Sequence, residues 1–188
     1  MTKKDATISQ VAGLFLIDSH DLLLELLKIG IHKAHTSDTI NLEERKKIMQ
    51  HLSDNGNAAA QIYWGHFYYN DKNYKEAFNL WYAASMQEDM LTEVLRETVN
   101  HNIGLAYYSG KGVSCDYKKA ASWFIKSAEI GGVNSQQSQY NLAVMYVNGE
   151  GVKQDVHEAS YWTNKARTGN NQDISNLAEQ LHNKHGLN

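Results

Sequence analysis

Two stretches of the chain decide its fold. Residues 104–128 read GLAYYSGKGVSCDYKKAASWFIKSA, and residues 143–167 read AVMYVNGEGVKQDVHEASYWTNKAR. Seven residues recur at a constant interval of 39 positions (110 to 149, for example): Gly110, Gly112, Val113, Asp116, Ala120, Trp123 and Lys126, repeated as Gly149, Gly151, Val152, Asp155, Ala159, Trp162 and Lys165. A period of about 20–50 residues is typical of stacked repeat proteins, which usually work by offering a surface to a partner.

The composition indicates an ordinary folded protein and limits the classes of partner. The chain has 188 residues, 42% of them hydrophobic and 21% charged, which suits one domain with a sizeable core. Its formal net charge of −3 supplies no general attraction to nucleic acid or anionic lipid. The single Cys115 excludes an internal disulfide and a cysteine-built zinc site, and it fits a reducing compartment. We therefore expect no nucleic-acid partner, no membrane partner and no cofactor.

The N-terminal segment imitates a secretory signal only loosely. Lys3 and Lys4 precede an apolar run at residues 11–17, but Asp5 interrupts the basic region and Asp18 ends the run. No small-residue cleavage site follows, and the charged residues further on argue against a membrane span there. The expected location is the cytoplasm, with the periplasm as the alternative if this segment acts as a signal.

Outside the repeats the sequence predicts helices and no strand. The chain has no proline and no β-alternation of any length. Residues 7–35 predict one or two helices, with a cap or break at Asp18 and Ser19. The apolar residues that keep helical spacing there are Leu14, Ile17, Leu24, Leu27 and Ile31. After a loop at residues 36–39, a helix over 42–52 ends near Gly56, which suits the left-handed position beyond a helix.

Each repeat is predicted to consist of two helices joined by a glycine loop. Gly65 and Gly104, with Ala143 in the third copy, let the second helix approach the first closely. The paired loop glycines permit positive φ, so that the second helix folds back. Asp116 and Asp155 are placed to cap that second helix. Packing explains four further repeated positions: Ala120, Ala159, Trp123 and Trp162.

On these residues the chain resembles the Sel-one-like repeat (SLR) family, relatives of the tetratricopeptide repeats. The pattern A-x-x-x-L-G-x-x-Y-x-x-G-x-G-V-x-x-D-x-x-K-A-x-x-W-x-x-K-A-A is matched closely in residues 98–131 and 137–170. A degenerate copy over 57–90 has Leu80 at the tryptophan position. The resemblance implies an all-α fold, a right-handed α/α superhelical solenoid. Residues 132–138 lengthen the junction between two copies relative to the usual family spacing.

The domain organisation follows from this alignment of the copies. Residues 1–41 form a predicted N-terminal helical extension that matches no known pattern. The predicted solenoid covers residues 42–170 and begins with a degenerate half repeat at 42–56. Residues 171–188 form a C-terminal capping helix, because their polar content is typical of a solvent-facing cap.

In the geometry that the family implies, the first helix of each repeat lines a concave groove. Apart from the neighbouring asparagines, the residues on that face vary between copies, whereas the core positions do not. Tyrosine, leucine and valine there suit an apolar or aromatic peptide, and neighbouring asparagines suit its backbone. The predicted partner-binding groove comprises Ile62, His66, Tyr69, His101, Asn102, Leu105, Tyr108, Tyr140, Asn141, Val144 and Val147. The alternative is that this face packs on residues 1–35 or merely faces solvent.

Other candidate sites in the sequence carry weaker signals. An acidic cluster is usually a solvated face, and otherwise it steers a basic partner; here it comprises Glu88, Asp89, Glu93 and Glu97. Two His-x-x-His pairs, His32/His35 and His182/His185, each place two imidazoles on one predicted helical face, which is half a zinc site. Cys115 with His101 or His157 lacks an orienting acid, and the glycine loops lack the Lys-Ser/Thr of a phosphate loop.

The resemblance implies a non-enzymatic protein–protein interaction module, a bacterial adaptor or scaffold that binds another protein in its groove. One alternative is an immunity protein that neutralises a secreted bacterial toxin, because some members of the family look like such inhibitors. A second is a small hydrolase-type enzyme using Cys115. A third is a homodimer through residues 1–42, because the leucine-rich helix there has more apolar surface than a cap requires.

Overall fold

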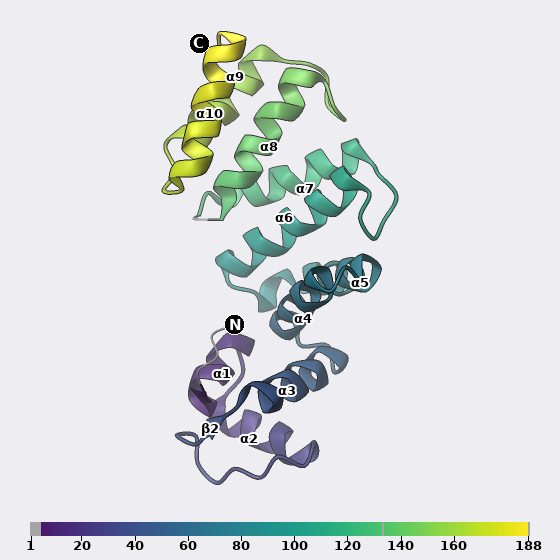
Figure 1. Ribbon diagram of the computed structural model, residues 1–188, viewed down its shortest axis with the longest axis vertical. Coiled ribbons are helices and arrows are strands. Elements are labelled where there is room, and N and C mark those ends of the chain that lie inside the picture. Colours follow the sequence, from purple (N-terminus) through teal and green to yellow (C-terminus); the bar gives the residue numbers. More distant parts are fainter. Residues whose placement is uncertain (1–4, 133, 188) are drawn as a thin grey trace. The chain divides into compact units, whose positions relative to one another are not determined.

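The computed structural model describes residues 5–132 and 134–187, and the chain divides into two compact units, Met1–Leu91 and Thr92–Asn188. Figure 1 shows the helices of both units. The N-terminal unit contains β1 (Ala6–Thr7), α1 (Ile8–Phe15), α2 (Ser19–Lys28), β2 (Thr39–Ile40), α3 (Leu42–Asp54), α4 (Ala58–Asn70), α5 (Tyr74–Ser85) and the 3₁₀ turn η1 (Glu88–Met90). The C-terminal unit contains α6 (Glu93–Ser109), α7 (Tyr117–Ile130), α8 (Ser135–Asn148), α9 (Val156–Arg167) and α10 (Gln172–His185).

The N-terminal unit contains one short β-ladder, so the prediction of no strand was wrong. β1 and β2 pair antiparallel, with Ala6 opposite Ile40 and Thr7 opposite Thr39. Two residues on each side are too few to leave an alternating pattern in the sequence. The ladder joins the start of α1 to the residues before α3, where Asn41 caps α3 in a capping box with its Glu44.

The predicted break at Asp18 is confirmed, but the predicted apolar face of the first helices is wrong. The Asp18 side chain accepts a hydrogen bond from the backbone N–H of His20 and so caps α2. Leu24 and Leu27, expected in the core, are 59% and 54% exposed, whereas α2 buries Leu22 and Leu26. Five of the ten residues of α2 are leucines, so spacing alone does not choose the buried side.

The predicted helix also stops short of residue 35. α2 ends at Lys28, and His32 and His35 lie in the irregular segment before β2. These two imidazoles therefore do not share a helical face, and the prediction that they do was wrong. The Asp38 carboxylate accepts hydrogen bonds from the backbone N–H groups of Ala34 and His35 at 2.9 and 3.1 Å, which orders this segment without a helix.

The predicted helix pairs and their close contacts are confirmed. A Cβ added to Gly65 would lie 2.5 Å from Nε1 of Trp81, and one added to Gly104 would lie 2.7 Å from the Phe124 ring. Each glycine thus makes room for a large aromatic side chain on the following helix. At the equivalent positions of the third repeat, the residues are Ala143 and Thr163, both fully buried.

The loops and caps of the repeats also follow the prediction. The four loop glycines have positive φ, from 68° to 82°: Gly110, Gly112, Gly149 and Gly151. The Asp116 side chain accepts from the backbone N–H of Lys119, and Asp155 accepts from the N–H groups of His157 and Glu158. The second helices of the second and third repeats, α7 and α9, therefore begin at an aspartate cap that follows the left-handed glycine turn, whereas α5 of the first repeat begins at Asn73 without a side-chain cap.

Candidate functional site

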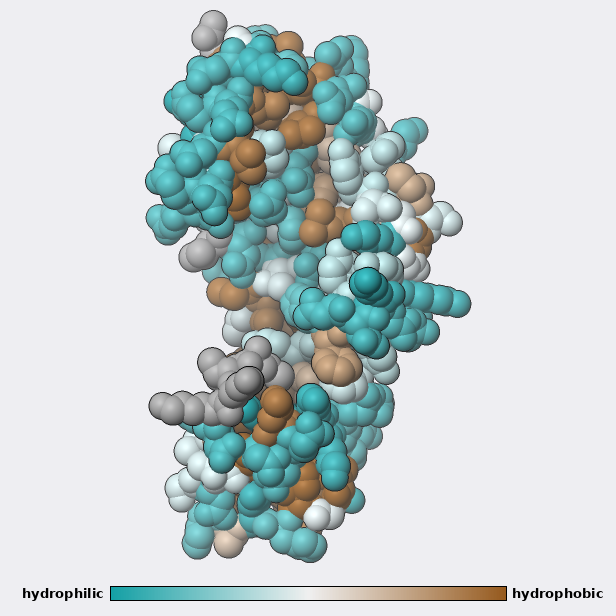
Figure 2. All heavy atoms as spheres, viewed as in Figure 1, coloured by the Kyte–Doolittle hydropathy of each residue, from teal (hydrophilic) through white to brown (hydrophobic). Residues whose placement is uncertain are grey.

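The C-terminal unit places eight of the predicted groove residues on two neighbouring helices. α6 and α8 are the first helices of their repeats, and α8 is followed by α10 on its other side (Figure 1). We use the name α6–α8 face for the side chains that these helices share, all of them half-buried: His101, Asn102, Leu105, Tyr108, Tyr140, Asn141, Val144 and Val147. The face is apolar and neutral polar, and none of the eight carries a formal charge at neutral pH. In Figure 2 hydrophobic patches lie among hydrophilic side chains over this part of the unit.

His101 is held at the end of the face where α6 and α8 meet. Its Nδ1 lies 2.8 Å from the Ser138 hydroxyl of α8, and its ring lies 5.6 Å from the Phe124 ring of α7. Burial lowers the pKa of His101 from 6.5 to about 4. The imidazole is therefore neutral at physiological pH and presents one donor and one acceptor nitrogen.

Tyr108 links the two repeats at the other end of the face. Its hydroxyl donates to Oε2 of Glu150, in the loop after α8, at 2.9 Å. The ring makes an edge-to-face contact with Tyr117 at 5.2 Å. Burial, together with the hydrogen bond and negative charge of Glu150, raises the pKa of Tyr108 to about 12. Tyr108 therefore stays protonated and has a fixed position.

The α8 side of the face continues toward α10. Tyr140 packs partly buried against Ala166, Ile174 and Ala178, which belong to α9 and α10. Asn141 accepts a hydrogen bond from Nε2 of Gln137, one turn earlier on α8, at 3.3 Å. Tyr140 and Asn141 thus have positions set by protein contacts.

The other three predicted groove residues belong to α4 in the N-terminal unit. Ile62 is fully buried, so the prediction that it lines an open groove was wrong. Helix α4 has buried residues on several sides, and Ile62 is one of them. The ring of His66 lies 5.5 Å from that of Trp81, and burial lowers the pKa of His66. Tyr69 contacts Tyr74 and Trp81.

A small cavity of about 310 Å³ opens beside His101, and of its lining only His101 is among the predicted groove residues. We name it the α6–α8–α10 pocket; it is lined by Thr98, His101, Asn134, Gln137, Asn171 and Ile174. Thr98 and Gln137 precede His101 and Asn141 by about one helical turn. Extending the predicted face by one turn toward the helix starts would have found both residues.

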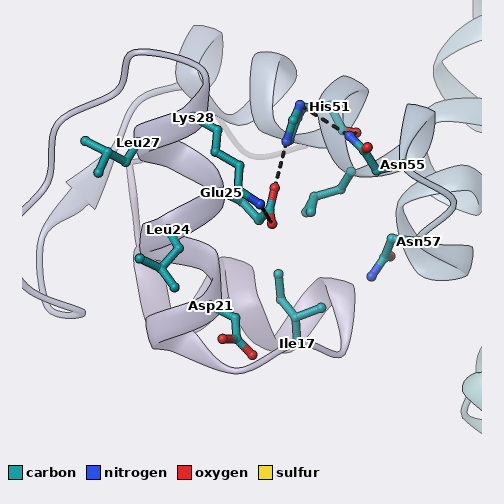
Figure 3. Close-up of a pocket in the computed structure, with 10 residues that line it drawn as sticks. Ile17, Asp21, Leu24, Glu25, Leu27, Lys28, His51, Asn55 and Asn57 are labelled. Atoms are coloured by element: carbon teal, nitrogen blue, oxygen red, sulfur yellow. Dashed lines mark hydrogen bonds and ion pairs between the residues drawn. The ribbon is translucent and has the colours of Figure 1, made fainter.

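A second cavity, of about 710 Å³, lies between α2 and α3 in the N-terminal unit. Glu25 lies between two basic partners, with Lys28 Nζ at 2.6 Å and His51 Nε2 at 2.7 Å (Figure 3). These contacts lower the pKa of Glu25, and the hydrogen bond from Lys28 has the largest effect. The remaining lining is largely apolar and includes Leu24 and Leu27. The Glu25 carboxylate is therefore held in place by Lys28 and His51.

The acidic cluster is smaller than the sequence indicated. Glu97 is 1% exposed, and its Oε2 accepts a hydrogen bond from the backbone N–H of Asn134 at 3.0 Å. It is therefore a structural residue, and its inclusion in a surface patch was wrong. Glu88 and Asp89 lie in η1, and Glu93 opens α6, where a carboxylate favours the helix N-terminus.

The candidate metal and thiol chemistry gains no support from geometry. Among residues 5–132 and 134–187, no three His, Cys, Asp or Glu side chains come together as a metal site would require. Cys115 is exposed, and its Sγ contacts the backbone carbonyl of Tyr108 at 3.5 Å. In the part of the chain that the structure describes, no helix combines the length and apolar character that crossing a membrane requires.

Comparison with known protein families identifies the class of protein. The Sel1 repeat matches three times, at residues 58–89, 100–132 and 136–171, which together cover more than half of the chain. The chain belongs to the Sel1 repeat family. Proteins of this family are generally scaffolds for protein interactions and are typically non-enzymatic. A search of curated proteins finds no match.

Two solved structures share the fold. A Sel1 repeat protein from Oxalobacter formigenes has a TM-score of 0.62 and 22% identity, over 92% of this chain and 62% of that chain. The protein c5321, a protective antigen of uropathogenic Escherichia coli strains with an SLR fold, has a TM-score of 0.64 and 24% identity, over 95% of this chain and 34% of that chain. This chain thus spans less than two thirds of either length, and the likeness confirms the predicted all-α repeat fold.

Proposed function

We propose that this protein is an adaptor that binds a polypeptide partner on the α6–α8 face. The proposal is supported by the difference between two kinds of position in the repeats: those that the copies share and those at which they differ. Positions shared by the copies serve packing, turns and caps, as with Asp116 and Asp155. Positions that differ between the copies, such as Leu105 and Val144, lie half-buried together on one face. Packing explains those shared residues, and a specific partner would explain the residues that differ on this partly exposed face.

The chemistry of the face favours recognition by shape and hydrogen bonding. Leu105, Val144 and Val147 supply apolar area that a partner would remove from water. Tyr108 and Tyr140 supply rigid aromatic contacts, which are common at the energetic centres of interfaces. No charge on the face steers a partner, so we expect binding to depend only weakly on salt.

A pull-down from native lysate tests this proposal. Val144→Glu places a charge in the centre of the face and is expected to abolish capture of the partner. Val156→Glu is the matched control, because Val156 is 58% exposed at the start of α9, outside the face. Equal recovery with wild type, Val144→Glu and Val156→Glu, all folded by circular dichroism, would reject the face as the binding site. A captured toxin would change the proposed role from adaptor to inhibitor.

Self-association through the N-terminal unit is a second candidate function. It is favoured by four large exposed apolar side chains near the start of this unit: Leu14, Leu16, Leu24 and Leu27. Light scattering over a range of concentrations tests it. A dimer that Leu24→Glu converts to monomer would support it, and a monomer of the wild type at high concentration would remove it.

A further inference from the structure

A relay of buried hydroxyl groups fixes the proton position on His101. The Ser127 hydroxyl donates its only hydrogen to the backbone carbonyl of Glu97 at 3.0 Å. The 2.9 Å contact between Ser138 and Ser127 therefore requires Ser138 to donate. With that hydrogen used, the 2.8 Å contact between Ser138 and His101 requires the hydrogen of His101 Nδ1. In the neutral ring, Nε2 then carries a lone pair and no hydrogen.

Packing does not require this relay. Ser127 and Ser138 are both fully buried, yet the residues 39 positions away, Ala166 and Val99, are apolar and equally buried. A buried hydroxyl costs free energy unless it is hydrogen-bonded, so a packing role alone favours the apolar residue. The distinctive effect of the two serines is to orient the His101 ring and select its tautomer. The relay is thus a positioning device for Nε2.

The residues that line the α6–α8–α10 pocket carry both hydrogen-bond acceptors and donors. His101 Nε2 and Gln137 Oε1 are acceptors that make no hydrogen bond within residues 5–132 and 134–187. Asn171 turns its Oδ1 toward the backbone N–H groups of Asp173 and Ile174, at 3.1 and 3.3 Å, so its NH₂ group is left as a donor. The six lining residues carry no formal charge when His101 is neutral.

We infer that this pocket binds a carboxamide side chain, Asn or Gln, of the polypeptide on the α6–α8 face, with His101 Nε2 as an acceptor for its NH₂ group. The inference rests on the proposed function, because the pocket adjoins that face through His101. A carboxamide offers two N–H donors and a carbonyl acceptor, which matches both kinds of group in the lining. A carboxylate has no hydrogen to donate, and an ammonium group has no lone pair to accept with.

The strongest competing ligand is a cation. The buried carboxylate of Glu97 accepts a hydrogen bond from the backbone N–H of Asn134, one of the residues that line the pocket. A negative charge there attracts an ammonium group, although Glu97 does not itself line the pocket. A valid test must therefore separate neutral from positively charged ligands of the same size.

Side-chain NMR of the full-length protein with three small probes provides this test. Long-range ¹H–¹⁵N spectra at neutral pH report the tautomer of His101 directly, and we expect Nδ1 to be protonated and Nε2 bare. Acetamide is expected to shift His101 Nε2 and the side-chain amides of Gln137 and Asn171. Acetate and methylammonium at equal concentration are expected to shift them little. The largest shifts with methylammonium, or no shifts with acetamide, would overturn the inference.

Three variants separate the pocket from the relay that positions it. His101→Phe keeps a ring beside Phe124 but removes the acceptor, so acetamide should bind about fivefold more weakly. His157→Phe, on the exposed start of α9, is the matched control and should bind acetamide as wild type does. Ser138→Ala should shift the His101 tautomer toward Nε2–H and weaken acetamide binding. An unchanged tautomer in Ser138→Ala would overturn the relay.

The inference and the proposed function fail on different readouts. Acetamide binding is measured without any partner, whereas the Val144→Glu pull-down depends on one. If acetamide binds and Val144→Glu still captures the partner, the pocket is supported and the α6–α8 face is rejected as the binding surface. If Val144→Glu loses the partner but acetamide does not bind, the α6–α8 face is supported as the binding surface and the carboxamide ligand is rejected.

Discussion

At the scale of single residues, one buried side chain in each of the last two repeats connects the first helix to the segment that follows the second helix. Glu97 accepts from the backbone N–H of Asn134 at 3.0 Å, and Gln136, 39 positions later, accepts from the N–H of Asn171 at 2.8 Å. Gln136 also donates to the backbone carbonyl of Ala166 at 2.7 Å. The same connection is therefore made once by a carboxylate and once by an amide.

This equivalence predicts the effect of two substitutions at Glu97. Glu97→Ala should lower the free energy of unfolding by about 1–3 kcal/mol, because it removes a buried carboxylate and with it the acceptor for the backbone N–H of Asn134. Glu97→Gln should be at least as stable as wild type, since Gln136 fills the equivalent position as an amide. Urea denaturation at neutral pH measures both. An alanine variant as stable as wild type would show that this hydrogen bond does not stabilise the fold.

The contact of Gly104 with Phe124 predicts an asymmetry between two glycines. Gly104→Ala should destabilise the protein by about 1–3 kcal/mol, because its Cβ would lie 2.7 Å from the ring. Gly13→Ala in α1 is the control: nothing lies within 4 Å of its Cβ, and alanine should add about 0.5–1 kcal/mol through helix propensity. Thermal unfolding compares the two. Stabilisation by both substitutions would contradict the close approach of the helices.

His101 predicts a specific dependence of stability on pH. Burial holds its folded pKa at about 4, below the usual 6.5, so the unfolded chain binds more protons between these values. The free energy of unfolding should therefore fall by up to about 3 kcal/mol as pH drops from 6.5 to 4, and this contribution should level off below pH 4. Burial also lowers the pKa of His66, so His66 should likewise lower the free energy of unfolding as the pH falls.

The variant His101→Phe isolates this contribution. Its stability should fall less steeply than that of wild type between pH 6.5 and 4, as measured by urea denaturation at each pH. Asp116 and Asp155 have lowered pKa values because they accept backbone hydrogen bonds, so the stability they add is lost below the usual aspartate pKa. Identical slopes for wild type and His101→Phe above pH 4 would show that His101 is not buried as described.

At the scale of elements, the aspartate caps are the features that the sequence predicts best. Asp155→Ala should lower the free energy of unfolding by about 1 kcal/mol, since two backbone N–H groups at the start of α9 lose their acceptor. Asp155→Asn keeps an oxygen acceptor and should remain within a few tenths of a kcal/mol of wild type. Chemical denaturation measures both. Equal losses in the two variants would attribute the effect to charge rather than to capping.

Helix faces were predictable only where the repeats supplied an internal comparison. The recurrence of Gly65, Gly104 and Ala143 identified the packed side of α4, α6 and α8 from the sequence alone. α2 has no second copy in the chain, and its leucines occupy several sides, so periodicity placed Leu24 and Leu27 in the core where the structure exposes them. Tertiary contacts with α1 and α3, rather than pattern, decide which leucines are buried.

At the scale of the molecule, repetition made the all-α repeat fold predictable, and it directed attention to the positions that vary. It could not reveal the His101 relay, because Ser127, Ser138 and His101 come from three different helices. Repetition also led to the wrong prediction that Ile62 lines the groove. Ile62 occupies the same place in its repeat as His101 and Tyr140, but its side chain is fully buried. Variation between copies thus indicates a candidate surface, and burial decides which of its residues a partner could touch.

The measurement that tests the central claim most directly is photo-crosslinking in the native cell. A photoreactive amino acid at position 144 lies on the α6–α8 face, and one at position 156 lies on the start of α9 and serves as the control. We predict one dominant crosslinked partner from position 144 and none of the same mass from position 156. The same product from both positions, or a product from position 156 alone, would contradict the α6–α8 face as the binding surface.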